Sequence, residues 1–378
     1  MEPKLAALQE VSVAREGKLY VSLELSDKSW RVAASDGTRV SEYTVRGGDG
    51  AGLLALLERV RRRFGLGPQA PVLSCYEAGR DGFWVHRLLQ AHGVNNHVVD
   101  AASIEVNRRA RRAKTDRLDV RALLGLLIRY VSGERRAWSV LRVPGAQAED
   151  ERRVYRERER LLKERGAHRA RMQSLLLLHN LRRVDLRLAG LGERLGALGV
   201  GPRLRAELER EAERLALVER QLAAIAKART SELAQPGAAD PHSKQRALER
   251  LRAVGPIGAE VLVRELFGWR SFANRRELAG AVGLVPTPYD SGQSNREQGI
   301  SKAGNRRVRA LLVELAWAWL RYQPQSALAC WYARRFAHGG TRLRRIGIVA
   351  LARRLLIALW HYLEHGVIPE GAKLKGAQ

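Results

Sequence analysis

Four acidic residues stand at positions from which their side chains can converge on one metal ion. Asp116 and Asp119 are three residues apart in a segment typical of a helix, so they share one face. Glu24 lies within an apolar run and Glu77 directly follows another, where a sheet can present ligands to a cleft. Carboxylate oxygens suit Mg²⁺, and Mg²⁺ beside a nucleic acid suits phosphodiester chemistry. We therefore predict a magnesium site formed by these four acids, although Asp116 taken alone can equally be a helix cap.

A run of basic residues leads directly into the two aspartates. Its cations are Arg108, Arg109, Arg111, Arg112 and Lys114. These side chains can deliver a phosphate backbone to the metal site, because arginine binds phosphate with a planar pair of donors. The alternative interpretation is a solvated basic loop.

A second segment, residues 289–309, combines serines with glycines and cations. Ser291 precedes Gly292 in a sequence typical of a turn, where a hydroxyl can be exposed. The cations that can neutralise a phosphate there are Arg296, Lys302, Arg306 and Arg309. The composition predicts a phosphate-binding loop. It does not choose among Ser291, Ser294 and Ser301 as a nucleophile.

The composition points to a polyanionic partner. The chain of 378 residues has 67 Lys and Arg against 40 Asp and Glu, a net charge of +27, and 45% hydrophobic residues. The hydrophobic content excludes a disordered basic tail, and the charge indicates nucleic-acid binding. The alternative is a ribosomal-type or generically basic protein.

The cysteines and the apolar runs indicate the compartment. Cys75 and Cys330 lack metal-ligand spacing, so we expect reduced residues at the core or its boundary. No run approaches ~18–20 uncharged apolar residues, and the N-terminus lacks a signal-peptide pattern. We expect a cytoplasmic, nucleoid-associated bacterial protein without a membrane partner.

The first part of the chain, residues 1–148, is predicted to be an α/β domain. Strands are expected at residues 19–25, 30–34, 39–45, 71–76 and 94–99, and helices at 51–64, 82–92 and 116–130. Asp36-Gly37 is the expected hairpin turn. A strand meander followed by strand–helix alternation indicates a central mixed sheet, and the ribonuclease-H-like fold has this order.

Residues 149–235 are predicted to contain two long helices, separated by a glycine-rich run at 196–202. The apolar heptad positions are Leu204, Leu208, Leu215, Val218, Leu222 and Ile225. Glu211 is the one charged interruption. The two helices can form an antiparallel hairpin or a dimerising coiled coil, or an ordinary hairpin with a solvated charged face.

Residues 236–378 are predicted to form a mainly α-helical domain after a linker at 236–242. A Gly-x-x-Gly turn, Gly255 to Gly258, resembles a helix-hairpin-helix element, whose backbone N–H groups can hold a phosphate. Helices are expected at 307–322 and 343–364. Four tryptophans are expected to pack in the core: Trp317, Trp319, Trp331 and Trp360.

Taken together, these residues resemble the transposases of the IS110 superfamily, in particular its IS1111 branch. The most specific matches are short motifs in a fixed order: Tyr76-Glu-Ala-Gly, Lys114-Thr-Asp-Arg-Leu-Asp119, Gly283-Leu-Val-Pro286, Ser291-Gly, and Gly299-Ile-Ser-Lys-Ala-Gly-Asn305. The resemblance covers nearly the whole chain.

The resemblance implies a first domain similar to the Holliday-junction resolvase RuvC and a C-terminal transposase domain. It implies that the family's four-acid (DEDD) metal motif falls on Glu24, Glu77, Asp116 and Asp119, and that its serine nucleophile falls on Ser291. Glu24 departs from the family's commonest pattern, which has Asp there, so the metal distance or strand register must adjust to one extra methylene. The resemblance also implies a structured RNA, encoded by the element, that pairs with donor and target DNA.

We therefore expect an RNA-guided transposase that joins donor and target DNA through a magnesium-assisted phosphoserine intermediate. Two DNA partners must be held together, so we expect a homo-oligomer, either a dimer or a tetramer. One alternative is a metal-only junction-resolving nuclease that uses water and needs the acids but not Ser291. Another is a non-catalytic nucleic-acid-binding protein, which predicts broken acids, whereas all four are present.

Overall fold

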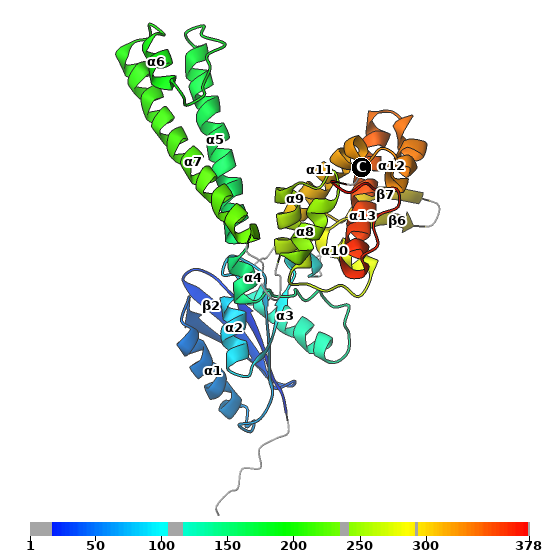
Figure 1. Cartoon of the computed structure of the whole chain (residues 1–378). Coiled ribbons are helices and arrows are strands. Elements are labelled where there is room, and N and C mark those ends of the chain that lie inside the picture. The colour runs from blue at the N-terminus through cyan, green and yellow to red at the C-terminus, as the bar shows by residue number, and fades with distance from the viewer. Residues whose placement is uncertain (1–16, 105–115, 235–241, 292–293, 377–378) are drawn as a thin grey trace, which may run out of the picture. The chain divides into compact units, whose positions relative to one another are not determined.

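The chain forms two compact units, residues 1–143 and 144–378. The computed structural model describes residues 17–104, 116–234, 242–291 and 294–376 (Figure 1). The predicted three-part division, with boundaries at 148 and 235, stays a prediction. The predicted linker at 236–242 lies almost entirely outside the described residues, and so does the basic run at 105–115.

The first unit is built on a mixed five-stranded sheet. Its strands are β1 (Leu19–Glu24), β2 (Ser29–Ser35), β3 (Val40–Arg46), β4 (Val72–Glu77) and β5 (Asn95–Val99). Their order in the sheet is β3-β2-β1-β4-β5. The β1–β2 and β2–β3 pairs are antiparallel, whereas β4 runs parallel to both β1 and β5. This sheet confirms the predicted α/β class of the first domain.

The predicted turn between β2 and β3 is present. The Asp36 carboxylate accepts hydrogen bonds from the backbone N–H groups of Thr38 and Arg39, at 3.0 and 2.7 Å. Gly37 takes a φ of +97°, which disfavours any residue with a Cβ. The hydrogen bonds of Asp36 and the positive φ of Gly37 are therefore those expected of a turn formed by an Asp-Gly pair.

Helices cover both faces of this sheet. The helices of the unit are α1 (Gly50–Arg63), α2 (Trp84–Ala91), the short 3₁₀ helix η1 (Ala101–Ser103) and α3 (Asp116–Val131). Leu19, Val21 and Leu23 of β1 pack in one core with residues of α1 and α2. Cys75 of β4 packs on the other face with residues of α3. Because side chains alternate along a strand, each face of the sheet has its own helical layer.

The second unit begins with a long helical hairpin. Its helices are α4 (Ala146–Asp150), α5 (Arg153–Leu177), α6 (Leu191–Gly196) and α7 (Pro202–Ala234). Helices α5 and α7 lie side by side (Figure 1). They are antiparallel, because His168 pairs with Glu211 while Leu161, nearer the start of α5, packs on Val218 and Leu222. This confirms the predicted pair of long helices; a dimerising coiled coil stays a prediction.

The charged interruption of the heptad pattern, Glu211, is buried within the hairpin. Its carboxylate accepts hydrogen bonds from His168 Nδ1 and Arg171 Nη1, both at 2.6 Å, and from Arg214 Nη1 at 2.7 Å. Burial alone would raise the pKa of Glu211, but the bonds from His168 and Arg171 hold this pKa below its ordinary value. The interruption is therefore an ion-paired core position.

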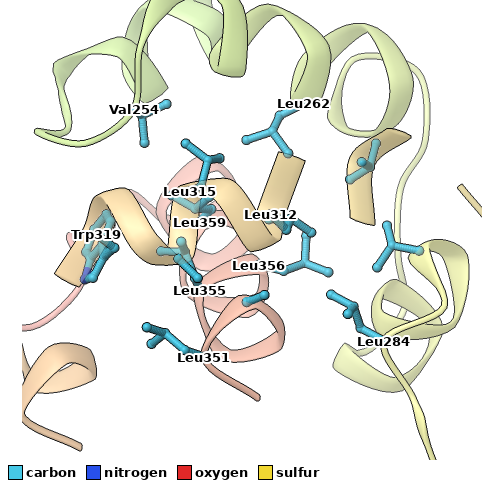
Figure 2. Close-up of a cluster of buried hydrophobic side chains, with 14 of the residues drawn as sticks. Val254, Leu262, Leu284, Leu312, Leu315, Trp319, Leu351, Leu355, Leu356 and Leu359 are labelled. Carbon is cyan, nitrogen blue, oxygen red and sulfur yellow. The ribbon is translucent and has the colours of Figure 1, made fainter. Parts of the chain in front are cut away.

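The rest of the second unit is a helical core with one small β-hairpin. Its elements are α8 (Ser243–Arg250), α9 (Pro256–Leu262), the π-helix η3 (Val263–Phe267), α10 (Arg275–Val282), β6 (Pro286–Ser291), β7 (Ser294–Ile300), α11 (Arg306–Tyr322), α12 (Ala327–Tyr332), the π-helix η4 (Ala333–Ala337) and α13 (Thr341–His365). Figure 2 shows Leu312, Leu315 and Trp319 of α11 beside leucines of α13. The mainly helical prediction holds apart from β6 and β7, which the sequence analysis did not predict.

Helix α13 is long and apolar enough, by length and composition, to cross a membrane. Its apolar side chains have another explanation, because Leu351, Leu355 and Leu359 are fully buried in the core that Figure 2 shows. The helix also carries Arg353 and Arg354 at its centre. These features are those of a core helix.

Trp317, expected in the core, and Cys330, expected at the core or its boundary, are both exposed. Trp319 is buried, and Trp331 and Trp360 pack against the core, but Trp317 is 51% exposed. Trp317 lies two residues before Trp319 on α11, a spacing that turns it away from the core face. Cys75 is buried as expected, whereas Cys330 is exposed.

Two short packed helices occupy the predicted helix-hairpin-helix segment, but the predicted Gly255–Gly258 turn is wrong, because α9 already begins at Pro256. Helices α8 and α9 contact each other across residues 251–255. The left-handed residue of this turn is Ala253, with a φ of +79°, rather than a glycine. Gly258 lies within α9, buried against Leu311 and Leu315. Phosphate binding at this turn stays a prediction.

We predict that Glu211→Gln weakens the hairpin at neutral pH by about 1.5–3 kcal/mol, the usual contribution of hydrogen bonds to a charged group. Because the folded pKa of Glu211 is lowered, its stabilisation is present above the unfolded pKa of about 4.3 and is lost as the pH falls through the folded value. Urea unfolding of both proteins should therefore give a difference that shrinks below about pH 4.

The matched control is Glu213→Gln, which alters an exposed glutamate on the same helix and should change the unfolding free energy by less than about 0.5 kcal/mol. A loss for Glu211→Gln that stays constant from pH 7 to pH 3 would contradict the ion-pair interpretation.

Candidate functional site

The first part of the candidate site is an acidic edge of the sheet, formed by Glu24 and Glu77. The pairing of β1 with β4 ends at Leu23 opposite Tyr76, so Glu24 and Glu77 follow at the next pair of positions. Each is the final residue of its strand. Glu24 is half-buried and Glu77 is exposed. The sheet register thus brings these two predicted ligands to neighbouring positions.

Both carboxylates belong to the face of the sheet that α3 covers. Two residues before Glu24, the Ser22 hydroxyl donates to the Val120 carbonyl oxygen at 2.6 Å. Two residues before Glu77, Cys75 Sγ lies 3.8 Å from the Leu123 carbonyl oxygen. Because side chains two apart on a strand share a face, Glu24 and Glu77 lie on the α3 side.

The start of helix α3, with Asp119, lies toward this edge. Val120, which follows Asp119, is fixed to β1 by the Ser22 hydrogen bond and packs against Ala33. Asp119 is half-buried in the first turns of α3, and Asp116 is the first residue of the helix. The side chain of Asp116 lies outside the described part of the chain.

The donor chemistry of this edge fits a hard divalent cation, since its candidate ligands are all carboxylates. Burial raises the pKa of the nearby Cys75 thiol far above its ordinary value, so Cys75 offers no thiolate ligand. Among the described residues, no group of three or more His, Cys, Asp or Glu side chains is placed to hold a metal ion. The four-acid site therefore stays a prediction that this edge of the sheet supports only in part.

The second part of the candidate site is a β-hairpin that carries Ser291 at its end. Strands β6 and β7 pair antiparallel, and the last pair is Ser291 with Ser294. Ser291 is thus the final residue of a strand, where the sequence predicted a turn. The side chains of Ser291, Ser294 and Arg296 lie outside the described part of the chain. Ser301 lies at the other end of the hairpin, where its N–H donates to the Val285 carbonyl at 2.9 Å.

The base of this hairpin is held by contacts between two backbone segments, 280–285 and 301–305. Asn305 N–H donates to the Ala281 carbonyl at 2.8 Å, and Lys302 N–H donates to the Gly283 carbonyl at 3.2 Å. A Cβ at Gly283 would lie 1.9 Å from the Ala303 oxygen, and a Cβ at Gly304 would lie 2.4 Å from the Ala281 oxygen. Only glycine permits this close approach at either position.

Arg309 belongs to this base. Its guanidinium donates to the Val282 carbonyl at 2.8 Å and approaches the Ala303 carbonyl at 3.5 Å. Burial, and secondarily the neighbouring Arg306, lower its pKa. The structure therefore gives Arg309 backbone partners at the hairpin base, while Lys302 and Arg306 are exposed.

A buried carboxylate, Glu265, connects the hairpin base to helix α5. Its Oε2 accepts from Asn305 Nδ2 at 2.8 Å, and its Oε1 accepts from Arg156 at 3.0 and 2.6 Å. Arg152 lies 3.6 Å away. Asn305 in turn caps α11, since its Oδ1 accepts from the N–H groups of Arg307 and Val308. Glu265 was not predicted as a site residue; its one signal in the sequence is that it stands beside Arg264 between apolar residues of the segment 262–267.

Comparison with known proteins places this chain beside transposases. Residues 245–330, which include the whole serine hairpin, match the model described as Transposase IS116/IS110/IS902 family. The chain is 41% identical over 377 residues, 95% of each protein, to Putative transposase y4rJ of Sinorhizobium fredii (strain NBRC 101917 / NGR234). It is 31% identical over 134 residues, 34% of this chain and 38% of the relative, to the transposase for insertion sequence element IS1328 of Yersinia enterocolitica.

We predict that Gly283→Ala destabilises the second unit more than Gly299→Ala does. Both glycines have positive φ, +69° and +89°, so both variants pay backbone strain of about 1–2 kcal/mol. Gly299 has open space around a new Cβ, whereas Gly283 meets the Ala303 oxygen. The extra cost at Gly283 should be about 1–3 kcal/mol. Urea unfolding measures it, and equal losses would show that the backbone contact is not tight.

Proposed function

Because the chain belongs to the IS116/IS110/IS902 family and is a DNA transposase, we propose that the acidic edge and the serine hairpin are the two parts of its catalytic machinery. The observation that carries this proposal is the placement of Ser291 at the end of a short hairpin whose base is fixed backbone to backbone. Ser291 and Ser294 end the two strands of this hairpin, and the anchored base would hold the direction of the strands.

We infer a ribonuclease-H-like arrangement for the first unit. The support is the strand order β3-β2-β1-β4-β5, in which an antiparallel meander joins two parallel strands. Glu24 and Glu77 end the two central parallel strands, and α3 brings Asp119 toward the same face. These residues and Asp116 would hold Mg²⁺, which when bound supplies positive charge beside a DNA phosphate.

The reaction that we propose is a transesterification at phosphorus. The Ser291 oxygen attacks a DNA phosphorus and loses its proton, a P–O bond to serine forms, and the P–O bond to the 3′ oxygen breaks. The departing 3′ oxygen takes a proton and becomes a free hydroxyl. After strand exchange, a 3′ hydroxyl attacks the phosphoserine and releases Ser291. Bond energy is retained throughout, so the cycle consumes no nucleotide.

The cations of the serine segment have a role in this step. Lys302 and Arg306 are exposed, and Arg296 belongs to β7 opposite Tyr289. Their charge would stabilise the negative charge that grows on the phosphoryl oxygens. The run from Arg108 to Lys114, which precedes the acids in sequence, would position the phosphate backbone.

We also propose a structured guide RNA and a homo-oligomer as partners. A net charge of +27 suits the binding of both DNA and RNA phosphates. Base pairing with a guide RNA would supply the sequence specificity that contacts to the phosphate backbone lack. Joining donor and target DNA requires two bound duplexes, which favours a dimer or a tetramer over one chain.

We predict that Ser291→Ala retains DNA binding but forms no covalent protein–DNA adduct, because the attacking oxygen is gone. End-labelled DNA on a denaturing gel, followed by peptide mapping of the shifted species, measures the adduct. Ser294→Ala, which changes the residue paired with Ser291, and Ser301→Ala, at the base of the hairpin, are the matched controls and should retain it. Wild-type cleavage by Ser291→Ala, with no adduct in any variant, would instead support the water-dependent nuclease.

We predict that Glu24→Gln, Glu77→Gln, Asp116→Asn and Asp119→Asn each abolish magnesium-dependent strand cleavage without lowering the melting temperature. Each change removes a metal-binding charge at nearly constant volume. Glu58→Gln, on the exposed side of α1, is the control and should cleave normally. Full activity in any two of the four variants would refute the assignment of the acids.

A further inference from the structure

A long stretch near the C-terminus contains basic residues and no acidic ones. Between Glu314 and Glu364 the chain has no Asp or Glu. Its arginines are Arg321, Arg334, Arg335, Arg342, Arg344, Arg345, Arg353 and Arg354. In a chain with 40 acidic residues among 378, this stretch concentrates positive charge in a part of the sequence that follows the serine hairpin.

The fold gathers five of these arginines at one corner of the second unit. Phe336 of η4 packs on Gly347 of α13, where a Cβ would lie 2.4 Å from its ring. The Tyr332 hydroxyl donates to the Arg344 carbonyl at 3.3 Å. These contacts place η4 against the first turns of α13. The resulting basic corner consists of Arg334, Arg335, Arg342, Arg344 and Arg345, all exposed.

No described carboxylate forms an ion pair with an arginine of the basic corner. Three exposed arginines of the helical hairpin differ in this respect. Arg153 pairs with Asp150 at 3.1 Å, Arg187 with Asp185 at 2.8 Å, and Arg205 with Glu209 at 3.0 Å. A carboxylate neutralises each of these three arginines locally, whereas the described arginines of the corner remain available to an external anion.

We propose that the basic corner binds the phosphate backbone of double-stranded DNA beside the serine hairpin's own contacts. The proposal rests on the proposed function in taking DNA as the substrate. The larger aromatic side chains described at the corner present no open face to unpaired bases: Tyr332 and Phe336 are buried, and Arg354 covers Trp331 at 4.1 Å from the ring centre. The small ring of His338 is exposed there. A surface of five cations with one small ring fits duplex phosphates better than a single strand.

The beginning of α13 strengthens this anion site. Arg342 and Arg345 are three residues apart and lie on one side of the helix. The positive end of the helix dipole adds to their charge at the same place. The basic corner lies outside residues 245–330, the segment that matches the transposase family, and it contains none of the residues assigned to the chemistry.

The test compares two full-length triple variants of equal charge. Arg342→Gln, Arg344→Gln and Arg345→Gln together remove corner charges. Arg153→Gln, Arg187→Gln and Arg205→Gln together remove the same charge from paired hairpin arginines. The dissociation constant for a DNA duplex is measured over a series of salt concentrations. The corner variant should flatten the slope of log affinity against log salt by about 2–3, since each duplex phosphate contact contributes about 0.9.

The control variant should change that slope by less than about 0.9, the contribution of one phosphate contact. If both variants flattened the slope of log affinity against log salt equally, the effect would depend on net charge alone, and the proposal would be overturned. An unchanged slope in the corner variant would overturn it too. An RNA duplex of the same sequence and vesicles containing anionic lipid are measured in parallel. A loss confined to either of them would assign the corner to that partner and not to DNA.

Repeating the binding series in the Ser291→Ala background separates this proposal from the proposed function. Binding slopes do not depend on cleavage, so the corner can be confirmed even if no serine adduct ever forms. Circular dichroism melting of each variant checks that the core beneath α13 is intact. A corner variant that melts like the wild type and still binds DNA with the wild-type slope would leave no role for these arginines.

Discussion

The second unit depends on the buried carboxylate of Glu265. Burying a charge is costly unless partners compensate it, and here Arg156 and Asn305 do so from elements far apart in sequence. Asn305 also caps α11 and bonds to Ala281, so one side chain joins the helix start, the hairpin base and Glu265. The π-helical turn of η3 places Glu265 where both partners reach it. Glu265 thereby links α5 to the base of the serine hairpin.

The two parts of the candidate site are positioned by different physical means. In the first unit, sheet register sets Glu24 beside Glu77, and two hydrogen bonds from strand side chains fix α3 over them. In the second unit, close backbone packing and buried ion pairs position the serine hairpin, and glycines stand where a Cβ cannot fit. Charge is also distributed differently within that unit. The helical hairpin pairs many of its arginines internally, including at the buried Glu211, while no carboxylate in the described part of the chain pairs with the arginines of the corner formed by η4 and α13.

Local patterns in the sequence were sufficient for the sheet, the long helices and the position of Glu77 at a strand end. Glu24 was expected inside a strand at 19–25 and is instead the last residue of β1. Local patterns failed where a residue's environment is set by distant partners. Glu265 meets Arg156 across 109 residues, which no local pattern reveals. Residues 286–300 are rich in Pro, Gly, Ser and Asn and indicated a turn, yet cross-strand pairing makes 286–291 and 294–300 strands. Arg309 could not be distinguished from its exposed neighbours, because only the fold shows that its guanidinium is occupied by backbone carbonyls.

The anchored base of the β6–β7 hairpin makes it a lever. Strand β6 has six residues, so Ser291 stands roughly 17–20 Å from the segment that holds the base. A rotation of about 10° at the base would swing the tip by about 3 Å, the length of a hydrogen bond. A misplacement of a reacting atom by about 1 Å can lower a reaction rate a hundredfold. In the proposed reaction, the stiffness of the backbone at Gly283 and Gly304 would therefore govern how accurately the tip places Ser291. The close backbone contacts at Gly283 and Gly304 thus limit rotation of the hairpin about its base, so that a long hairpin can still place its tip accurately.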